Sequence, residues 1–229
     1  MTEPPRFLPV ESLSAEQAQM LQKTVPPNGD RMNVFRAMAH HAPLMERFCA
    51  FTQILRNEGR VPLRNREIVI LRVAWRTGSV YEFGSHTIVA RRAGLDEAEI
   101  QRTTEPGVSG WDEQDALLVQ LVDELHDADQ ISDTTWAGLS RTWDRPELIE
   151  LVLLVGLYHM TAWFMNGLRI PADPELPGWP DTDAKAYLAV APMMSAYLAG
   201  SSQSAGSAEP STCGCARPAA ARTQGSPPQ

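Results

Sequence analysis

Apolar residues recur at three- and four-residue intervals from about residue 12 to residue 168, and strand-like alternation is nearly absent. This spacing places apolar side chains on one face of an α-helix. The chain therefore predicts an all-α fold, a bundle of helices. The predicted helices cover residues 14–25, 32–41, 43–59, 63–77, 79–94, 96–102, 112–128, 132–143 and a long apolar stretch that ends at 168.

Residues that favour helix ends support these boundaries. Ser14 and Gln17 form the S-x-x-Q pattern of a capping box, and Ser79 and Glu82 form the S-x-x-E pattern. Proline suits the first turn of a helix and glycine suits the position after the last turn. Pro43 and Pro146 fit helix starts, and Gly59, Gly78 and Gly94 fit helix stops.

The amino-acid composition of the chain changes after Leu168. The proline-rich stretch "IPADPELPGWPDTD" predicts an irregular arm, and its Trp179 suggests an arm that wraps around a neighbouring subunit. We expect one domain over residues 10–180 and a possible extra helix within residues 181–199. Residues 200–229 are of low complexity and too poor in apolar side chains to order themselves. They predict a disordered tail.

Charge and composition exclude several partners. The formal net charge of the 229 residues is −8, with no clustered basic face, so we expect neither nucleic acid nor an anionic membrane as a partner. Residues 151–168 carry no charged side chain, which reaches the length of a membrane span. Their glycines and polar residues favour a buried helix of a bundle. The absence of an apolar leader near Met1 and the use of three cysteines predict a cytoplasmic protein.

Glu67 and His86 are the strongest candidates for chemistry. Glu67 lies within the apolar run "REIVILRVAW", where a carboxyl group needs a partner or a raised pKa. His86 lies on the next predicted helix, and Gly78 turns the chain back between the two. A carboxylate and an imidazole that face each other in a partly apolar cavity suit acid/base catalysis near neutral pH.

The stretch "LRNREIVILRVAWRTGSVYEFGSHTIVARRAGLDEAEI" resembles the carboxymuconolactone decarboxylase and alkylhydroperoxidase D-like family, and the resemblance covers most of residues 30–170. The peroxidase branch carries a glutamate, a C-x-x-C pair and a histidine four residues after the second cysteine. Glu67 and His86 match the first and last of these. The cysteine positions hold Ser79 and Glu82, and neither side chain replaces a thiolate or a resolving thiol.

The resemblance therefore implies a branch that transfers protons: a cofactor-independent lyase of the carboxymuconolactone decarboxylase type, or a related isomerase or dehydratase. Its substrate is a small unsaturated or lactone carboxylic acid. We expect His86 to act as acid/base and Glu67 to orient it. No cofactor or metal site is expected. The candidate catalytic residues are His86, Glu67, Glu82 and Tyr81, and the candidate substrate-binding residues are Ser79, His159 and Trp163.

Two other functions stay open at this point. A thiol peroxidase-like antioxidant would depend on Cys213 or Cys215, and a binding module would have kept the fold and lost catalysis. The resemblance also implies a homo-oligomer, a trimer or hexamer. His159 fits a satisfied core histidine better than a cavity wall, and we expect His126, flanked by acidic residues, to be solvated.

Overall fold

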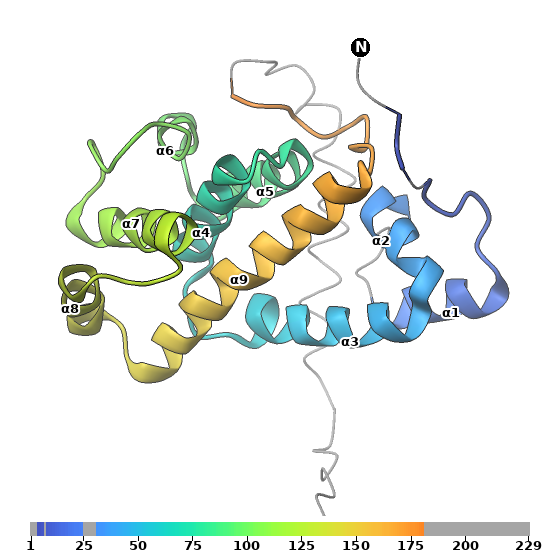
Figure 1. Ribbon diagram of the computed structural model, residues 1–229, viewed down its shortest axis with the longest axis horizontal. Coiled ribbons are helices and arrows are strands. Elements are labelled where there is room, and N and C mark those ends of the chain that lie inside the picture. The colour runs from blue at the N-terminus through green and yellow to red at the C-terminus, as the bar shows by residue number, and fades with distance from the viewer. Residues whose placement is uncertain (1–3, 7, 25–30, 181–229) are drawn as a thin grey trace, which may run out of the picture.

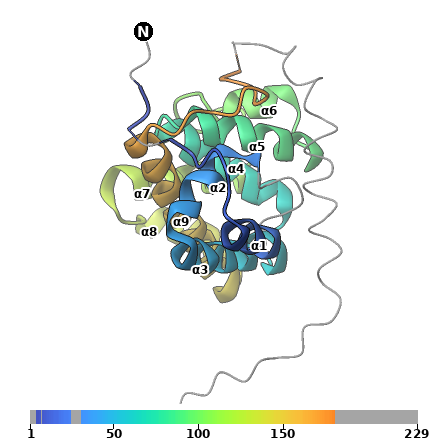
Figure 2. The ribbon, with the colours of Figure 1, turned by 90° about the vertical axis from the view of Figure 1, so that its right-hand side faces the viewer.

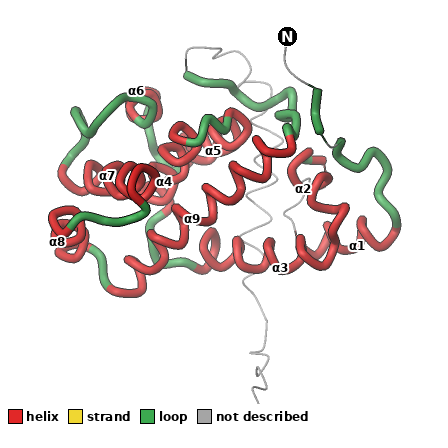
Figure 3. The backbone as a smooth tube through the Cα atoms, in the orientation of Figure 1, coloured by secondary structure: helices red, strands yellow, loops and turns green. Residues whose placement is uncertain are grey.

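The computed structural model describes residues 4–6, 8–24 and 31–180, and in this part of the chain it consists of helices and loops (Figures 1 and 3). The prediction of an all-α fold is confirmed. The expectations for residues 181–229 lie outside the described residues. The α-helices are α1 (Ala15–Thr24), α2 (Asn33–Met38), α3 (Ala42–Gln53), α4 (Leu63–Arg76), α5 (Val80–Arg92), α6 (Glu97–Arg102), α7 (Glu113–Ala128), α8 (Asp133–Thr142) and α9 (Arg145–Leu168). A 3₁₀ turn, η2 (Ala39–His41), and a π-helical turn, η3 (Ile54–Glu58), flank α3.

Helix α4 is the centre of the fold. It packs against α5, α7 and α9, and every side chain from Arg66 to Ala74 is buried. Most of these side chains are aliphatic and form the main hydrophobic core with apolar residues of the three surrounding helices. The charged members of this run must find partners inside the protein, because an unpaired buried charge is costly.

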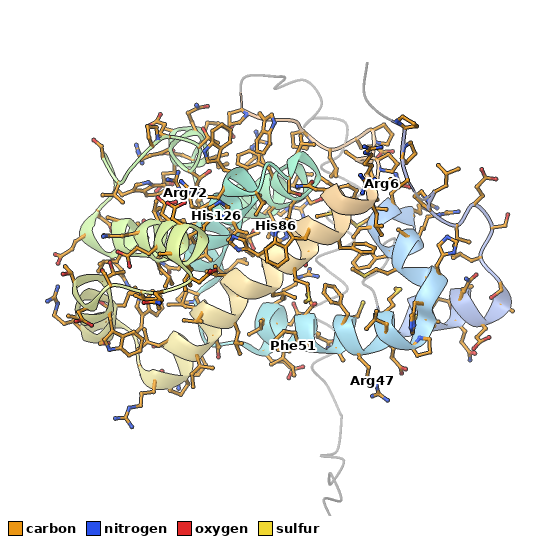
Figure 4. The ribbon with its side chains drawn as sticks, viewed as in Figure 1. Arg6, Arg47, Phe51, Arg72, His86 and His126 are labelled. Carbon is orange, nitrogen blue, oxygen red and sulfur yellow. The ribbon has the colours of Figure 1, made fainter. Side chains whose placement is uncertain are left out.

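One of these charges, Arg72, ties three elements together. Its Nε and Nη2 donate to the two carboxylate oxygens of Asp123 on α7, at 2.8 and 2.7 Å. Its Nη1 donates to the backbone carbonyls of Thr103 and Glu105 just after α6, at 2.9 and 2.6 Å. The guanidinium is 2% exposed. It therefore serves as a structural crosslink from α4 to the α6–α7 region (Figure 4).

Helix α9 crosses the molecule diagonally in Figure 1, and α3 runs beneath it. Among the described helices, α9 is the one long and apolar enough to cross a membrane by length and composition. One face of α9 packs on α4 and contributes to the main core. A soluble core helix passes the same test of length and composition, and the burial of this face matches that interpretation.

Helices α1, α2 and α3 lie on one side of this core in Figure 1, and they face the viewer in Figure 2. Leu21 of α1 and Met45 and Cys49 of α3 are buried together in a small apolar cluster. The N-terminal segment reaches across to α9, where Arg6 donates from its backbone N–H to the Leu168 carbonyl and from its side chain to the Gly167 carbonyl. These bonds satisfy carbonyls that the end of a helix leaves without a partner.

Most predicted helix ends are confirmed. Ser14 and Gln17 exchange both bonds of a capping box, at 2.8 and 3.1 Å. Pro43 lies in the first turn of α3, and Gly78 has a φ of 64° between α4 and α5, a conformation that glycine adopts at low cost. The prediction of a capping box at the start of α5 is wrong. Ser79 is the N-cap residue of α5, but its side chain makes no capping hydrogen bond, and neither carboxyl oxygen of Glu82 has a partner among the described residues.

The arm after α9 folds onto its own chain, and the expectation that it wraps around a neighbouring subunit stays a prediction. The Trp179 ring lies 5.2 Å from the ring of Trp75 and 4.9 Å from that of Phe83. Gly84 makes this docking possible, because a Cβ there would collide with the backbone carbonyl of Pro177. The arm thereby covers one side of α5.

Candidate functional site

A cavity of about 80 Å³ lies between α2, α3, α5 and α9, and its walls are largely apolar. The apolar walls come from side chains on all four helices, namely Met32, Val34, Phe35, Phe48, Val89, Leu157 and Met165. Polar groups reach it from α5 and from its neighbours, namely Tyr81, Glu82, Ser85 and His86 of α5, Thr52 of α3, Arg56 of η3, and Tyr158 and Thr161 of α9. Ligand sites typically combine such an apolar lining with a small number of placed polar groups.

His86 and Glu67 meet beside this cavity. Nδ1 of His86 lies 2.7 Å from Oε2 of Glu67, and the two side chains are 14% and 3% exposed. The edge of the His86 ring also packs on Tyr158 of α9, with ring centroids 4.9 Å apart and perpendicular planes. The ring is therefore held from two sides. Because Glu67 occupies Nδ1, Nε2 of His86 is the nitrogen left for a ligand (Figure 4).

Glu82 has a different environment, although it lies one turn from His86. It lines the cavity, it is 2% exposed, and neither carboxyl oxygen has a hydrogen-bond partner among the described residues. Burial raises the pKa of Glu82 well above its ordinary value. Burial therefore favours the protonated form of this carboxyl group, which carries an O–H donor, whereas Glu67 accepts from an imidazole.

The site contains groups that sequence patterns did not reveal. Ser85 lines the cavity with a buried hydroxyl that has no partner among the described residues. Arg56, from η3 at the end of α3, supplies a guanidinium to the lining. The position of Ser85 in the sequence, between Glu82 and His86, was the one feature that could have predicted its place at the site. Arg56 carried no such signal, because it is distant from α5 in the sequence and only the tertiary structure brings it to the same cavity.

Tyr81 lines the cavity, but its hydroxyl group is engaged elsewhere. The hydroxyl donates to Asp173 of the arm and accepts the backbone N–H of Val34 at 3.3 Å. Asp173 also accepts the backbone N–H of Asn33 at 3.0 Å. Burial raises the pKa of Asp173. Tyr81 thus joins α5, α2 and the arm, and it forms part of the cavity wall.

The three expected substrate-binding residues do not line this cavity. Ser79 is fully buried at the start of α5, and its hydroxyl has no partner among the described residues. His159 and Trp163 lie on the outward side of α9, with their rings 6.0 Å apart, and Trp163 is 67% exposed. The side chain of α9 that reaches His86 is Tyr158, one position before His159.

His159 instead pairs with His126 of α7, so the expectation that His126 is solvated is wrong. Nδ1 of His159 lies 2.9 Å from the Val155 carbonyl, and its Nε2 lies 2.9 Å from Nδ1 of His126. The carbonyl is only an acceptor, so His159 carries its proton on Nδ1 and accepts from His126. Partial burial, Arg76 and His159 lower the pKa of His126. This pair is a surface contact between α7 and α9.

No group of three or more His, Cys, Asp or Glu side chains in the described ranges is arranged to hold a metal ion. A second cavity, of about 360 Å³ and almost entirely apolar, lies between α3 and α9. Phe48 and Thr161 line both cavities, so the two share a wall.

Comparison with solved structures shows the class of this fold. A peroxidase-related protein from Silicibacter sp. TM1040 has a TM-score of 0.66 at 16% identity, covering 80% of this chain and 98% of that one. A peroxidase-related protein from Ralstonia eutropha JMP134, described as an alkylhydroperoxidase AhpD core, has a TM-score of 0.65 at 14% identity, covering 76% and 95%. A protein of unknown function from Agrobacterium tumefaciens has a TM-score of 0.55 at 16% identity, covering 59% and 94%. The fold is therefore of the alkylhydroperoxidase D type.

The sequence also matches the profile of the Carboxymuconolactone decarboxylase family over residues 42–109, which contain both Glu67 and His86. Together with the fold, this match supports the resemblance to the carboxymuconolactone decarboxylase and alkylhydroperoxidase D-like family. No curated protein matches the sequence significantly.

Proposed function

We propose that the protein is a cofactor-independent acid/base lyase of the carboxymuconolactone decarboxylase type, acting on a small unsaturated or lactone carboxylic acid. The observation that carries this proposal is the 2.7 Å contact between Nδ1 of His86 and Oε2 of Glu67 at the wall of a largely apolar cavity. A carboxylate that accepts a hydrogen bond from one imidazole nitrogen fixes the tautomer of the ring and the direction in which the other nitrogen points.

The proposed chemistry moves one proton. The substrate carboxylate breaks its C–C bond and leaves as CO₂, and the electron pair passes through the conjugated system to a carbonyl oxygen. The neutral carboxyl group of Glu82 and the hydroxyl group of Ser85 donate hydrogen bonds to that oxygen, which develops negative charge. Nε2 of His86 takes up a proton from solvent while Nδ1–H donates to Glu67, and Nε2 then transfers this proton to the dienolate carbon, which leaves His86 neutral. Donors directed at developing charge in an apolar cavity are worth more than the same donors in water.

Turnover of carboxymuconolactone, followed spectroscopically, tests this function. We expect Glu67→Gln and His86→Gln each to lose at least two orders of magnitude in kcat/KM, the range typical of acid/base catalysis. His126→Gln is the matched control, because His126 pairs with His159 at the surface and does not line the cavity. Undiminished turnover in His86→Gln contradicts the proposal. If the wild type turns over neither carboxymuconolactone nor other small unsaturated acids, the lyase assignment fails.

A thiol peroxidase is the competing function, because two of the similar structures are described as peroxidase-related. Peroxide reduction needs a reactive thiolate. The cavity is lined by Glu82 where the family pattern has its second cysteine, and Cys49 is buried in the small cluster between α1 and α3. Hydroperoxide turnover that disappears on truncation after residue 199 would favour the peroxidase over the lyase.

We also propose that the protein forms a homo-oligomer through the outward face of α9. This face carries a row of exposed apolar side chains at helical spacing, namely Ile149, Val152, Leu153, Met160 and Trp163. Contiguous exposed apolar surface of this kind marks an interaction site. Light scattering tests the proposal: the wild type should exceed the 25.3 kDa mass of one chain, and Trp163→Glu should lower the mass. A monomeric wild type contradicts it.

A further inference from the structure

The site cavity, the space beside His86 that Glu82 and Ser85 line, is too small for a complete ligand. Its volume is about 80 Å³, whereas sites for small molecules usually span about 300–1,000 Å³. An apolar cavity of about 150 Å³ in another protein is filled by a single benzene molecule. The site cavity therefore takes the reacting end of a ligand, and the rest of that ligand lies outside it.

The second cavity adjoins the site cavity and has the missing volume. It measures about 360 Å³ and lies between η2 and α3 on one side and the C-terminal half of α9 on the other. Phe48 and Thr161 line both cavities, so a ligand that passes beside these two side chains occupies both. The apolar side chains that line the second cavity alone are Ala37, Met38, Leu44, Met45, Met160, Phe164 and Leu168.

The second cavity offers little to a polar ligand or to water. Its polar side chains are those of His40, His41 and Thr161, and each is already bonded within the chain. Thr161 donates to a backbone carbonyl one turn earlier at 2.8 Å, Nε2 of His40 lies 3.2 Å from a backbone carbonyl of the N-terminal segment, and Nδ1 of His41 accepts a backbone N–H at 3.3 Å. A buried water needs two to four polar partners. The second cavity therefore favours an apolar group.

The lining of the second cavity suits a flexible chain. Met38 of α2, Met45 of α3 and Met160 of α9 reach it from three different helices. Methionine is unbranched and polarisable, and it adapts to apolar ligands of varied shape. A thin chain also passes between Phe48 and Thr161 more easily than a ring does. These features favour an aliphatic chain over a rigid ring system.

We propose that the second cavity binds an unbranched aliphatic chain of the same ligand whose reacting end lies beside His86. The inference rests on the proposed lyase function only for the reaction at that end. By proportion to the cavity that holds benzene, the second cavity takes a chain on the order of ten carbon atoms. The substrate is thus an amphipathic molecule, with its polar head in the site cavity and its chain between α3 and α9.

Straight-chain alcohols test the chain site without any turnover. Calorimetry on hexanol, octanol and decanol should show affinity for the wild type rising about fourfold per added CH₂ group, because each one is buried. Methyl NMR of the methionines should locate bound decanol. We expect shifts for Met38 and Met160 in the second cavity and for Met32 and Met165 in the site cavity, whereas Met20 lines neither cavity and should stay unchanged.

A substitution at the shared wall tests the passage. Thr161→Phe places a ring between the two cavities, and it should weaken decanol binding at least tenfold while changing hexanol binding less than threefold. Thr134→Phe is the matched control, because Thr134 is exposed on α8, a helix that lines neither cavity. Thermal unfolding checks that both variants fold. If Thr161→Phe does not fold, the methyl shifts in the wild type decide.

The outcomes separate this inference from the lyase proposal. Equal affinity for hexanol and decanol overturns the inference, as do methyl shifts confined to one of the two cavities. Decanol binding that appears only in the Trp163→Glu variant would show that a second copy of the chain fills the second cavity, which also overturns it. If decanol spans both cavities but no unsaturated acid is turned over, the lyase proposal fails and the chain site stands.

Discussion

Glu67 and Glu82 are both buried carboxyl groups beside His86, but only Glu67 has a hydrogen-bond partner. Glu67 contacts Nδ1 of the imidazole, whereas both oxygens of Glu82 are without a partner among the described residues. Burial without a partner favours the protonated form of Glu82, an O–H donor, whereas Glu67 is placed to accept from the imidazole.

Substitutions of Glu82 should lower kcat, because this carboxyl group is proposed to donate a hydrogen bond in the reaction. In Glu82→Gln the amide N–H group replaces part of the proposed O–H donor of Glu82, because an amide also donates hydrogen bonds. In Glu82→Ala the donor is lost. We expect kcat to fall in the order wild type, Glu82→Gln, Glu82→Ala, with the last about two orders of magnitude below the wild type, as for the removal of one oxyanion donor. Steady-state kinetics measures this order. Equal activity in Glu82→Ala and the wild type would exclude Glu82 from the reaction.

Glu82 should also make stability depend on pH. Its pKa is raised in the folded state from 4.5, so above pH 4.5 the folded state holds a proton that the unfolded state has released. Stability therefore falls as the pH rises from 4.5 toward the folded pKa. Glu82→Gln removes this slope, and its Tm relative to the wild type should increase between pH 4 and pH 8. Parallel Tm profiles of the two proteins would show that Glu82 titrates normally.

Removing Arg72 should strongly destabilise the fold. Arg72→Ala leaves Asp123 without its two-pronged partner and leaves two backbone carbonyls without a donor. We expect a loss of about 3–5 kcal/mol in the free energy of unfolding, typical of breaking a buried pair. Arg60→Ala is the control, since Arg60 is 55% exposed and pairs with Asp144 near the surface. That control should lose no more than about 1 kcal/mol. Urea denaturation measures both.

Gly84 and Gly156 should respond in opposite directions to a methyl group. A Cβ at Gly84 collides with the Pro177 carbonyl, whereas nothing lies within 4 Å of a Cβ at Gly156. Gly84→Ala should displace the arm, change the fluorescence of Trp179 and cost about 1–3 kcal/mol. Gly156→Ala should be neutral or stabilising by up to about 1 kcal/mol, because alanine favours a helix interior. An unchanged fluorescence spectrum in Gly84→Ala would show that the arm docks without this close approach.

The pair of His126 and His159 should lower the free energy of unfolding in mild acid. The pKa of His126 is lowered from 6.5 in the folded state, so below pH 6.5 the unfolded state binds more protons. Stability falls as the pH drops from 6.5 through the folded pKa. His126→Gln should reduce this loss between pH 7.5 and pH 5.5, measured by urea denaturation. An NMR titration that places the pKa of His126 at or above 6.5 would contradict the prediction.

The sequence by itself determined the helices and the central pair of the site. Helix ends depend on local chemistry, so Pro43 and Gly78 mark them correctly, and the Ser14–Gln17 capping box forms as predicted. The meeting of Glu67 and His86 was also predictable, because the short turn at Gly78 brings two adjacent helices together. The resemblance to the family, carried by the spacing of these two residues, is confirmed by the fold and the family match.

Only the tertiary structure decided which way side chains point and which distant segments meet. Glu82 fits a capping box by spacing, but the cavity formed by α2, α3 and α9 takes its side chain instead. His159 and Tyr158 are neighbours in sequence, and the rotation of α9 decides that the tyrosine reaches His86. Arg56 joins the site because the tertiary structure brings η3 to the cavity that α5 lines. Such contacts depend on how helices rotate and pack, which local spacing does not specify.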